Sequence, residues 1–466
     1  MTGNNGLPQG WKLVELGEIV EDVIKVQPNE NPEEEFIYLD ISSIDNSQNI
    51  IVSPKRYLGK DAPSRARQLI KADDILFSTV RTYLKNIAQV PLAFDGQIAS
   101  TGFCVIRPKE SLNKKFYFYL ALSDQFINPL SEIQRGTSYP AVRNSDVLEQ
   151  KVPLPPLPEQ ERIVAKLEET FTQLEAGVAE LQNVKAQLKR YRAAVLKSAV
   201  EGELTREWRE AHRGEVEPAD ILLARILEER RKKWEAEDGK GKYKEPAAPN
   251  TDGLTELPDG WVWASLEQSA SFEPRSIQSG PFGSSLLHSE FQETGILAIG
   301  IDNVLDGKFS MGKQHRISQK KYGELEKYTA RPLDILITVM ATVGRCCVVP
   351  VDLETAIITK HVYRISANQE LINSYFLMYC ILAESVTRHQ IFGGVRGQTR
   401  PGINKSVLVN LAIPIPSLIE QERIVEKIER RLSVADEIEK ELDESLVRAE
   451  RLRGAVLKSA FEGRLV

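Results

Sequence analysis

The chain of 466 residues is built on an internal repeat. Two motifs occur twice: Leu-Pro-x-Gly-Trp, at 7–11 and 257–261, and Glu-Gln-Glu-Arg-Ile-Val, at 159–164 and 420–425. Residues 159–205 align with 420–466 without a gap and are identical at nearly half of the positions. The segments between the two motifs differ in the two halves. Matched ends around unmatched centres indicate one scaffold that carries two distinct globular heads.

Each Glu-Gln-Glu-Arg motif follows a proline-rich segment and opens a long amphipathic pattern. Proline suits the approach to a helix and its first turn, and glutamate there complements the helix dipole. Apolar residues then recur at spacings of three and four, which is typical of a coiled-coil seam. A helix of about 45 residues is roughly 65–70 Å long. The predicted seam and partner-docking residues are Val164, Leu167, Phe171, Leu174, Leu181, Leu188, Val425, Ile428, Leu432, Leu442, Leu446 and Val456.

These two patterns of equal length favour pairing with each other, antiparallel because a head separates them along the chain. The alternative is that each helix packs only on its own head. The heads mix β-rich runs with aromatic helical or strand-like segments, which predicts an α+β class. The predicted boundaries are a first head at 1–152, a first long helix at 153–205, a helical extension and linker at 206–253, a second head at 254–412, and a second long helix at 413–466.

Basic and polar residues gather in two loops at corresponding places of both heads, within stretches almost free of acidic residues. The stretch from Ile75 to Lys109 contains only Asp95 as an acid, and none lies between Glu384 and Glu420. Arginine and lysine bind phosphates and guanine edges, and glutamine reads adenine. The candidate DNA contacts are Ser78, Arg81, Tyr83, Lys85, Arg135, Ser138, Tyr139, Arg143, Thr342, Arg345, Arg396, Gln398, Arg400 and Lys405.

Other function classes find little in the sequence. It contains no Gly-x-Gly-x-x-Gly or Walker loop and no paired histidines, so we expect no catalytic residue. The four cysteines lack the spacing of a metal site or a disulfide framework, so no metal is expected. No apolar run approaches the roughly 20 residues of a membrane helix, and the polar N-terminus lacks a signal peptide's apolar region. A cytoplasmic protein without membrane contact is therefore expected; that it is prokaryotic is implied only by the family resemblance described next.

The order of these motifs resembles that of the specificity (S) subunits of Type I restriction-modification systems. The likeness includes Leu-Pro-x-Gly-Trp, Pro-Leu-Pro-Pro-Leu-Pro-Glu-Gln-Glu-Arg-Ile-Val at 153–164, and a long helix ending in Ala-Val-Leu-Lys-Ser-Ala at 194–199, followed by the whole plan again. Pro281–Leu286 and Asp334–Ile337 also resemble motifs of the family's target recognition domains. The resemblance covers nearly the full chain.

The resemblance implies two target recognition domains, each reading half of a bipartite site in double-stranded DNA, with the helices as a spacer. It also implies docking of two modification (M) subunits, which bind S-adenosylmethionine and methylate adenine, and of restriction (R) subunits, which use ATP and Mg. This chain itself would hold no cofactor. Residues 398–404 and 137–143 differ, so the target should be asymmetric. The alternatives are a coiled-coil adaptor that binds only proteins, which the net charge of -6 would suit, and a stand-alone DNA-modifying enzyme, which the missing motifs disfavour.

Overall fold

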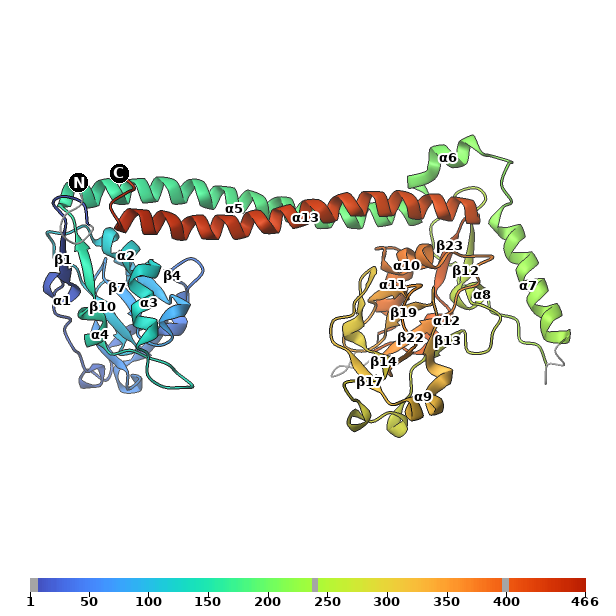
Figure 1. Cartoon of the computed structure of the whole chain (residues 1–466), viewed down its shortest axis with the longest axis horizontal. Helices are drawn as coiled ribbons and strands as arrows, with labels where there is room; N and C mark the ends of the chain where they lie inside the picture. The colour runs from blue at the N-terminus through green and yellow to red at the C-terminus, as the bar shows by residue number, and fades with distance from the viewer. Residues whose placement is uncertain (1–6, 237–241, 396–401) are drawn as a thin grey trace. The chain divides into compact units, whose positions relative to one another are not determined.

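The computed structural model describes residues 7–236, 242–395 and 402–466 (Figure 1). The chain divides into two compact units, one formed by Met1–Asn183 with Glu441–Val466 and the other by Val184–Lys440. Two helices of 44 residues each, α5 (Leu157–Val200) and α13 (Leu418–Phe461), contribute to both units. Each unit therefore contains one head, the start of the helix that follows this head in the chain, and the end of the other helix. The predicted α+β class with two long helices is confirmed.

A two-stranded antiparallel pairing closes each head beside its long helix. In unit 1, β1 (Lys12–Glu15) pairs with β11 (Lys151–Leu154). In unit 2, β12 (Val262–Ser265) pairs with β23 (Ala412–Ile415) in the same register. The first strand follows the Leu-Pro-x-Gly-Trp motif and the second precedes the helix, so the repeated motifs frame each head at one end.

The core of each head is built from two small sheets of the same plan. The central strands of corresponding sheets are β7 (Ile75–Ser78) and β19 (Ile335–Thr338), all eight residues of which are buried. In unit 1 the sheets are β10 (Phe103–Ile106)–β7–β8 (Ile87–Gln89) and β5 (Lys55–Leu58)–β2 (Glu35–Leu39)–β9 (Ile98–Ser100)–β6 (Ala66–Leu69). In unit 2 they are β13 (Ile277–Ser279)–β22 (Val362–Ile365)–β19–β20 (Cys346–Val348) and β17 (His315–Ile317)–β14 (Ile296–Ile299)–β21 (Ala356–Ile358)–β18 (Thr329–Ala330).

Short elements complete both heads. Hairpins are formed by β3 (Ile44–Asp45) with β4 (Ile50–Ile51) and by β15 (Val304–Leu305) with β16 (Lys308–Phe309). The remaining helices of the heads are α1 (Leu16–Ile19), α2 (Lys114–Leu122), α3 (Asp124–Glu132), α4 (Asn144–Leu148), α8 (Leu266–Ser269), α9 (Gln319–Leu325), α10 (Ser374–Leu382), α11 (Val386–Gly393) and α12 (Lys405–Val409).

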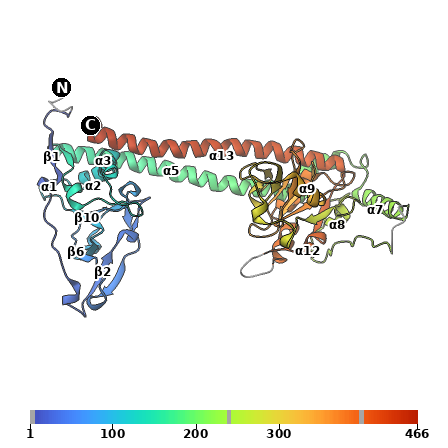
Figure 2. The same cartoon turned by 60° about the horizontal axis from the view of Figure 1, so that its bottom comes forward.

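An aromatic helix covers the face of each central sheet that lies toward the long helices. The sequence left residues 115–123 open between helix and strand, and they form α2, with α10 as its counterpart in unit 2. Figure 2 shows α2 and α3 beneath α5 and α13, with β2 and β6 farther away. Helix α2 packs directly on α5: the ring of Tyr119 in α2 lies 5.6 Å from the ring of Phe171 in α5, centroid to centroid.

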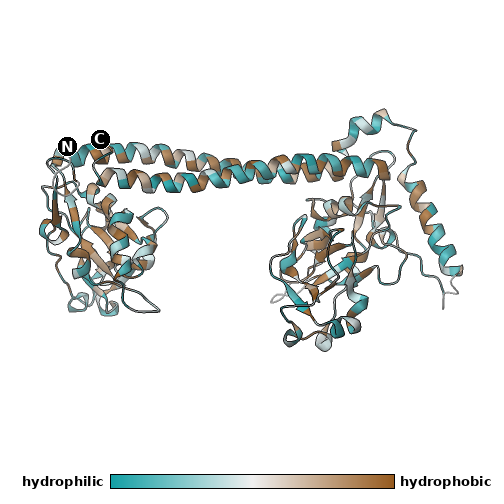
Figure 3. Cartoon of the chain, viewed as in Figure 1, coloured by the Kyte–Doolittle hydropathy of each residue, from teal (hydrophilic) through white to brown (hydrophobic). Residues whose placement is uncertain are grey.

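The long helices run antiparallel within each unit, as predicted. In unit 1, Arg453 of α13 forms an ion pair of 3.6 Å with Glu175 of α5 and stacks over the Phe171 ring. In unit 2, Arg192 of α5 forms an ion pair of 2.8 Å with Glu439 of α13. Figure 3 shows the alternation of apolar and polar residues along both helices. Charged residues of the two long helices therefore meet in pairs of opposite sign within each unit.

The second residue of each Glu-Gln-Glu-Arg motif joins its helix to its head. Gln421 is fully buried, and its side chain accepts a hydrogen bond from the backbone N–H of Asn373 at 2.7 Å. The same side chain donates to the backbone carbonyls of Leu371 and Pro416, both at 2.9 Å. Gln160 accepts from the backbone amide of residue 113 at 3.0 Å and donates to the carbonyl of residue 155 at 2.8 Å. The motif thus fixes where α2 and α10 begin relative to the long helices.

The extension after the first long helix contains two helices, α6 (Arg206–Ala211) and α7 (Ala219–Ala236). Both lie within the range 206–253 predicted as a helical extension and linker. Gly214, with φ of 84°, and Pro218 separate the two helices, because the left-handed backbone and the proline cannot continue a helix. The boundaries predicted at 152, 205, 253 and 412 stay predictions.

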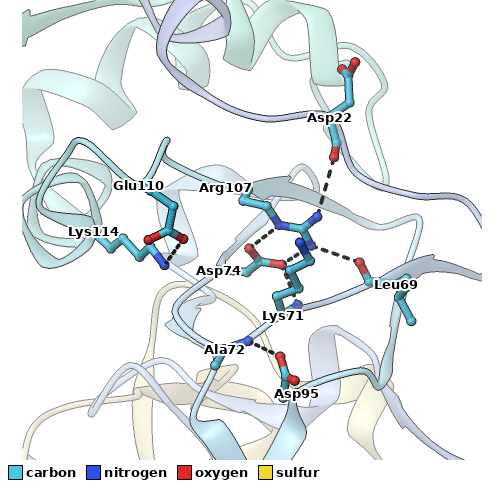
Figure 4. Close-up of polar contacts among 9 residues, drawn as sticks. All are labelled: Asp22, Leu69, Lys71, Ala72, Asp74, Asp95, Arg107, Glu110 and Lys114. Atoms are coloured by element: carbon cyan, nitrogen blue, oxygen red, sulfur yellow. Dashed lines mark hydrogen bonds and ion pairs between the residues drawn. The ribbon is translucent and has the colours of Figure 1, made fainter.

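A buried ion pair stabilises the first head at the start of β7 (Figure 4). Arg107 is 5 % exposed and its Nη2 lies 2.6 Å from Asp74 Oδ2. The Asp74 carboxylate raises the pKa of Arg107 through their hydrogen bond. In unit 2, Asp334 and Arg364 are both buried, and Arg364 Nε lies 3.7 Å from Asp334 Oδ2. Burial raises the pKa of Asp334 and lowers the pKa of Arg364.

Candidate nucleic-acid interface

The two candidate loops of the first head are joined by backbone hydrogen bonds. The amide of Arg81 donates to the Pro140 carbonyl at 2.8 Å, and the amide of Val142 donates to the Thr79 carbonyl at 2.9 Å. The first loop begins directly after β7, and the second lies between α3 and α4. Segments about 60 residues apart in the chain therefore form one composite loop surface.

The second head repeats this junction. The amide of Ile403 donates to the Val339 carbonyl at 3.1 Å, and Met340 forms a bridge with Gly402. Arg81 and Ala341 each lie three residues after the central strand and both have a left-handed backbone, with φ of 49° and 64°. A left-handed backbone is rare outside glycine. The backbone of the two junctions is thus alike, whereas the side chains on them differ.

Exposed groups suited to nucleic acid lie on the junction of the first head. Tyr139 is 72 % exposed, and the Arg81 guanidinium lies 5.2 Å from the centroid of its ring. Arg81 also donates to the Ser138 carbonyl at 3.1 Å. Tyr83, 53 % exposed, lies two residues beyond Arg81. An arginine held over an aromatic ring combines a cation for phosphate with flat faces for bases.

Two ion pairs and one backbone hydrogen bond hold three more of the candidate residues in place. Lys85 forms an ion pair with Asp124 at 2.8 Å, and Arg135 with Asp146 at 3.1 Å. Asp146 also accepts from the Arg143 amide at 2.7 Å, while the Arg143 side chain remains exposed. The Arg143 amide and the Arg135 guanidinium hold the pKa of Asp146 below its usual value. Asp146 therefore fixes both ends of the second loop.

Ser78 and Arg107 correct the sequence interpretation. Ser78 is 1 % exposed and its hydroxyl donates to the Val80 carbonyl at 2.9 Å, so it supports the loop from inside. Arg107 is a basic residue within the first acid-poor stretch, but it is buried in an ion pair with Asp74. Ser78 is the last residue of β7 and Arg107 directly follows β10, and every residue of these two paired strands is buried.

Two candidates of the second head act mainly within their loop. Thr342 is half-buried, and its carbonyl accepts from the Thr338 hydroxyl. The Arg345 amide donates to the same hydroxyl at 3.1 Å, and the Arg345 side chain is half-buried. Lys405 is exposed at the first position of α12. Arg396, Gln398 and Arg400 lie outside the described residues.

Sequence reasoning missed the support of the first loop. The turn between β3 and β4 contains Asn46, which donates to the Leu84 carbonyl at 2.8 Å, and Asn49, which donates to the Lys85 carbonyl at 3.0 Å. The run Asp45–Asn49 carries typical turn residues and was the available signal. A groove of about 1710 Å³ runs within unit 1 beside this turn, and Lys85 and Arg451 are among its lining residues.

The predicted seam residues lie inward on both helices. None of the twelve is exposed, and Leu167 and Ile428 are fully buried. Val164, Leu167 and Phe171 pack in the core of the first head together with Leu457 and Phe461 from the end of α13. The beginning of each seam therefore serves its head as well as the partner helix.

Within residues 7–236, 242–395 and 402–466, no cluster of three or more histidine, cysteine or acidic side chains could hold a metal ion. The described helices include none long and apolar enough to span a membrane. All four cysteines are free and buried, and burial raises the pKa of the Cys104 thiol to about 12.

Comparison with known proteins identifies the family. The family model described as the Type I restriction modification DNA specificity domain matches residues 8–185 and 298–448. The Type I restriction enzyme EcoBI specificity subunit of Escherichia coli is 28% identical over 422 residues, with 85% of this chain and 80% of the relative covered.

Two solved structures are similar over nearly their whole length. A chain from a study of complex assembly and conformational transition of the type I R-M system shares 31% identity, with a TM-score of 0.69 and coverage of 98% of this chain and 99% of the other. The HsdS subunit from Thermoanaerobacter tengcongensis shares 31% identity, with a TM-score of 0.51 and 99% of both chains covered. The chain therefore belongs to the family of Type I restriction-modification DNA specificity subunits.

Proposed function

We propose that each head reads one half of an asymmetric bipartite DNA target. The observation that carries this proposal is the joined loop pair, which occurs at the same place in both heads with one equivalent backbone hydrogen bond, one equivalent bridge and different side chains. Sequence is read by side chains that reach base edges, while a common backbone frame sets their position. Unlike side chains on like frames suit two different half-sites.

The residues on the first junction supply the chemistry of such contacts. Arg81 and Arg143 are cationic groups for phosphates or guanine, and Tyr139 offers an exposed ring. In the second head Lys405 is an exposed candidate cation among the described residues, and Arg396, Gln398 and Arg400 stay predictions. Net charge does not oppose this function, because local charge on the loops governs contact with DNA.

The long helices would set the spacing between half-sites and dock two methyltransferase subunits. Two repeats of head and helix offer two equivalent surfaces, which two identical partners require. In this proposal the partner subunits bind S-adenosylmethionine, ATP and Mg and carry out adenine methylation, and restriction subunits add cleavage. The chain itself contributes specificity and no catalytic group.

Methylome sequencing tests the proposal. Host DNA is sequenced with this gene intact and deleted, while the neighbouring methyltransferase gene stays expressed. We expect one bipartite, asymmetric, adenine-methylated motif to disappear with this gene alone. If no motif changes, the assignment of both heads to DNA is overturned.

Salt dependence separates DNA reading from the adaptor alternative. Contacts with phosphates release counterions, so the affinity of the assembled complex for a duplex carrying the motif should fall steeply as salt rises. An affinity that barely changes between about 50 and 200 mM salt would contradict phosphate contacts.

A further inference from the structure

The tryptophan of the Leu-Pro-x-Gly-Trp motif has the same backbone surroundings in both units. The amides of Trp11 and Trp261 donate to the proline carbonyl three residues earlier, at 3.2 and 3.1 Å. Each indole packs on the glycine that ends a long helix, Gly463 or Gly202, and an added Cβ there would lie 3.3 Å from the ring. Both indoles are 8 % exposed.

In unit 2 this buried indole belongs to a complete polar cluster. Trp261 Nε1 donates to Glu420 Oε2 at 3.0 Å, and Glu420 is 3 % exposed. Arg209 Nη1 from α6 and the Thr205 hydroxyl both donate to Glu420 Oε1 at 2.7 Å. The Arg209 guanidinium also lies 5.7 Å from the centroid of the Trp261 ring. The arginine therefore neutralises the buried carboxylate and covers the indole.

In unit 1 the same cluster is incomplete. Trp11 Nε1 is buried and has no hydrogen-bond partner among the residues that the structure describes. Glu159 aligns with Glu420 and is half-buried, and among the described residues its side chain forms no hydrogen bond or ion pair. Val466, which has no hydroxyl, aligns with Thr205. Among the described residues no cation pairs with Glu159, whereas Arg209 pairs with Glu420 in unit 2.

We propose that Trp11 and Glu159 form an acceptor site for an arginine side chain of a partner polypeptide. The chemistry is that of the filled cluster: a carboxylate binds a guanidinium through charge-assisted hydrogen bonds, and the indole face accepts its flat surface. A bound guanidinium would draw Glu159 into the position in which it accepts from Trp11 Nε1. The polar cluster of unit 2 is filled from within the chain, so this one feature distinguishes the otherwise equivalent surfaces of the two units. The site does not depend on DNA reading by the heads.

A grafted tail tests whether the site accepts arginine. A second copy of residues 206–214 is appended after Val466, which places its Arg209 equivalent where α6 lies in unit 2. The matched control carries the same tail with Arg209→Met in the appended copy. The readout is the Trp11 indole N–H resonance in ¹⁵N-labelled full-length protein, assigned with Trp11→Phe.

We expect the tail to move the Trp11 resonance toward that of Trp261, and the methionine tail to leave it unchanged. Glu159→Gln should abolish the shift. The site is overturned if both tails act alike. It is also overturned if Glu159→Gln moves the Trp11 resonance in the protein without a tail, because the carboxylate would then already hold the indole.

A binding measurement tests whether the methyltransferase subunit supplies the arginine that fills this site. The purified methyltransferase subunit is titrated with the unmodified chain, with both tailed chains and with Glu159→Gln. We expect the arginine tail and Glu159→Gln to weaken one binding event at least tenfold, and the methionine tail to have less effect. If the affinity is unchanged although the tail occupies the site, the methyltransferase subunit does not supply the arginine, and its assignment as the partner is overturned. This result is distinguishable from loss of DNA recognition, which the methylated motif reports separately.

Discussion

Asp74 and Arg107 form a buried ion pair in which two nitrogens of one guanidinium contact both oxygens of one carboxylate, at 2.8 and 2.6 Å. Arg107 also donates to the Leu69 carbonyl at 3.1 Å (Figure 4). The pair thus connects the turn before β7, the end of β10 and the end of β6. These elements position the first loop of the candidate interface.

Arg107→Met should destabilise the first head strongly. Removing one partner leaves a buried charge uncompensated, which costs about 3–5 kcal/mol. Urea unfolding followed by a probe in unit 1 measures the change. Arg56→Met is the matched control, because Arg56 and Glu35 are exposed and such pairs contribute at most about 1 kcal/mol. Equal effects of the two substitutions would contradict a structural role for the buried pair.

Gln421→Ala should loosen the junction between α13 and the second head. The substitution leaves the Asn373 amide and two carbonyls without their partner, and each buried unsatisfied group costs about 1–3 kcal/mol. Thermal unfolding compared with Gln182→Ala, an exposed position on α5, measures the loss. A Gln421→Ala protein as stable as the control would show that water satisfies these groups.

Acid should release the second loop of the first head. The pKa of Asp146 is lowered in the folded state, so its stabilising bonds are present above its unfolded pKa of about 3.9 and are lost as the pH falls through the lower folded value. The protection factor of the Arg143 amide, which is its exchange rate corrected for the intrinsic dependence on pH, should therefore fall at acid pH. Asp146→Asn should exchange faster at neutral pH and lose this pH response, and an unchanged rate in that variant would argue against the role of Asp146.

Arg81→Ala should alter recognition of one half-site only. A specific base contact contributes about 1–3 kcal/mol of discrimination, and Arg81 lies on the junction of the first head. The reciprocal control changes Arg396, Gln398 and Arg400 to alanine in the second head, and it should affect the other half-site. Methylome sequencing of each variant reads both halves together. Loss at both halves from either variant would point to general phosphate binding or assembly.

Lengthening the helices should lengthen the spacer of the target. Four residues inserted after Asn183 and four after Lys440 add about one turn, roughly 6 Å, to both helices. At about 3.4 Å per base pair, the methylated motif should gain one or two base pairs between its halves. The same insertion after Asp252, in an exposed segment outside the helices, is the control and should leave the motif unchanged. An unchanged spacer in the helix variant would disprove the proposal that the long helices set the spacing between the half-sites.

The sequence alone determined the repeat, the two long helices and the places of the candidate loops. These features are local: a periodic apolar pattern specifies an amphipathic helix, and proline followed by Glu-Gln-Glu-Arg marks its start. Tertiary structure decided which polar residues remain available. Ser78 and Arg107 look like contact residues in the chain, yet strand pairing buries both.

Only the tertiary structure brought Arg81 beside Tyr139, assigned Gln160 and Gln421 to the junctions between helix and head, and showed one Trp–Glu cluster complete and the other open. Each of these features joins residues far apart in sequence. Their formation depends on burial and on the geometry of hydrogen bonds between elements, which no local pattern of residues encodes.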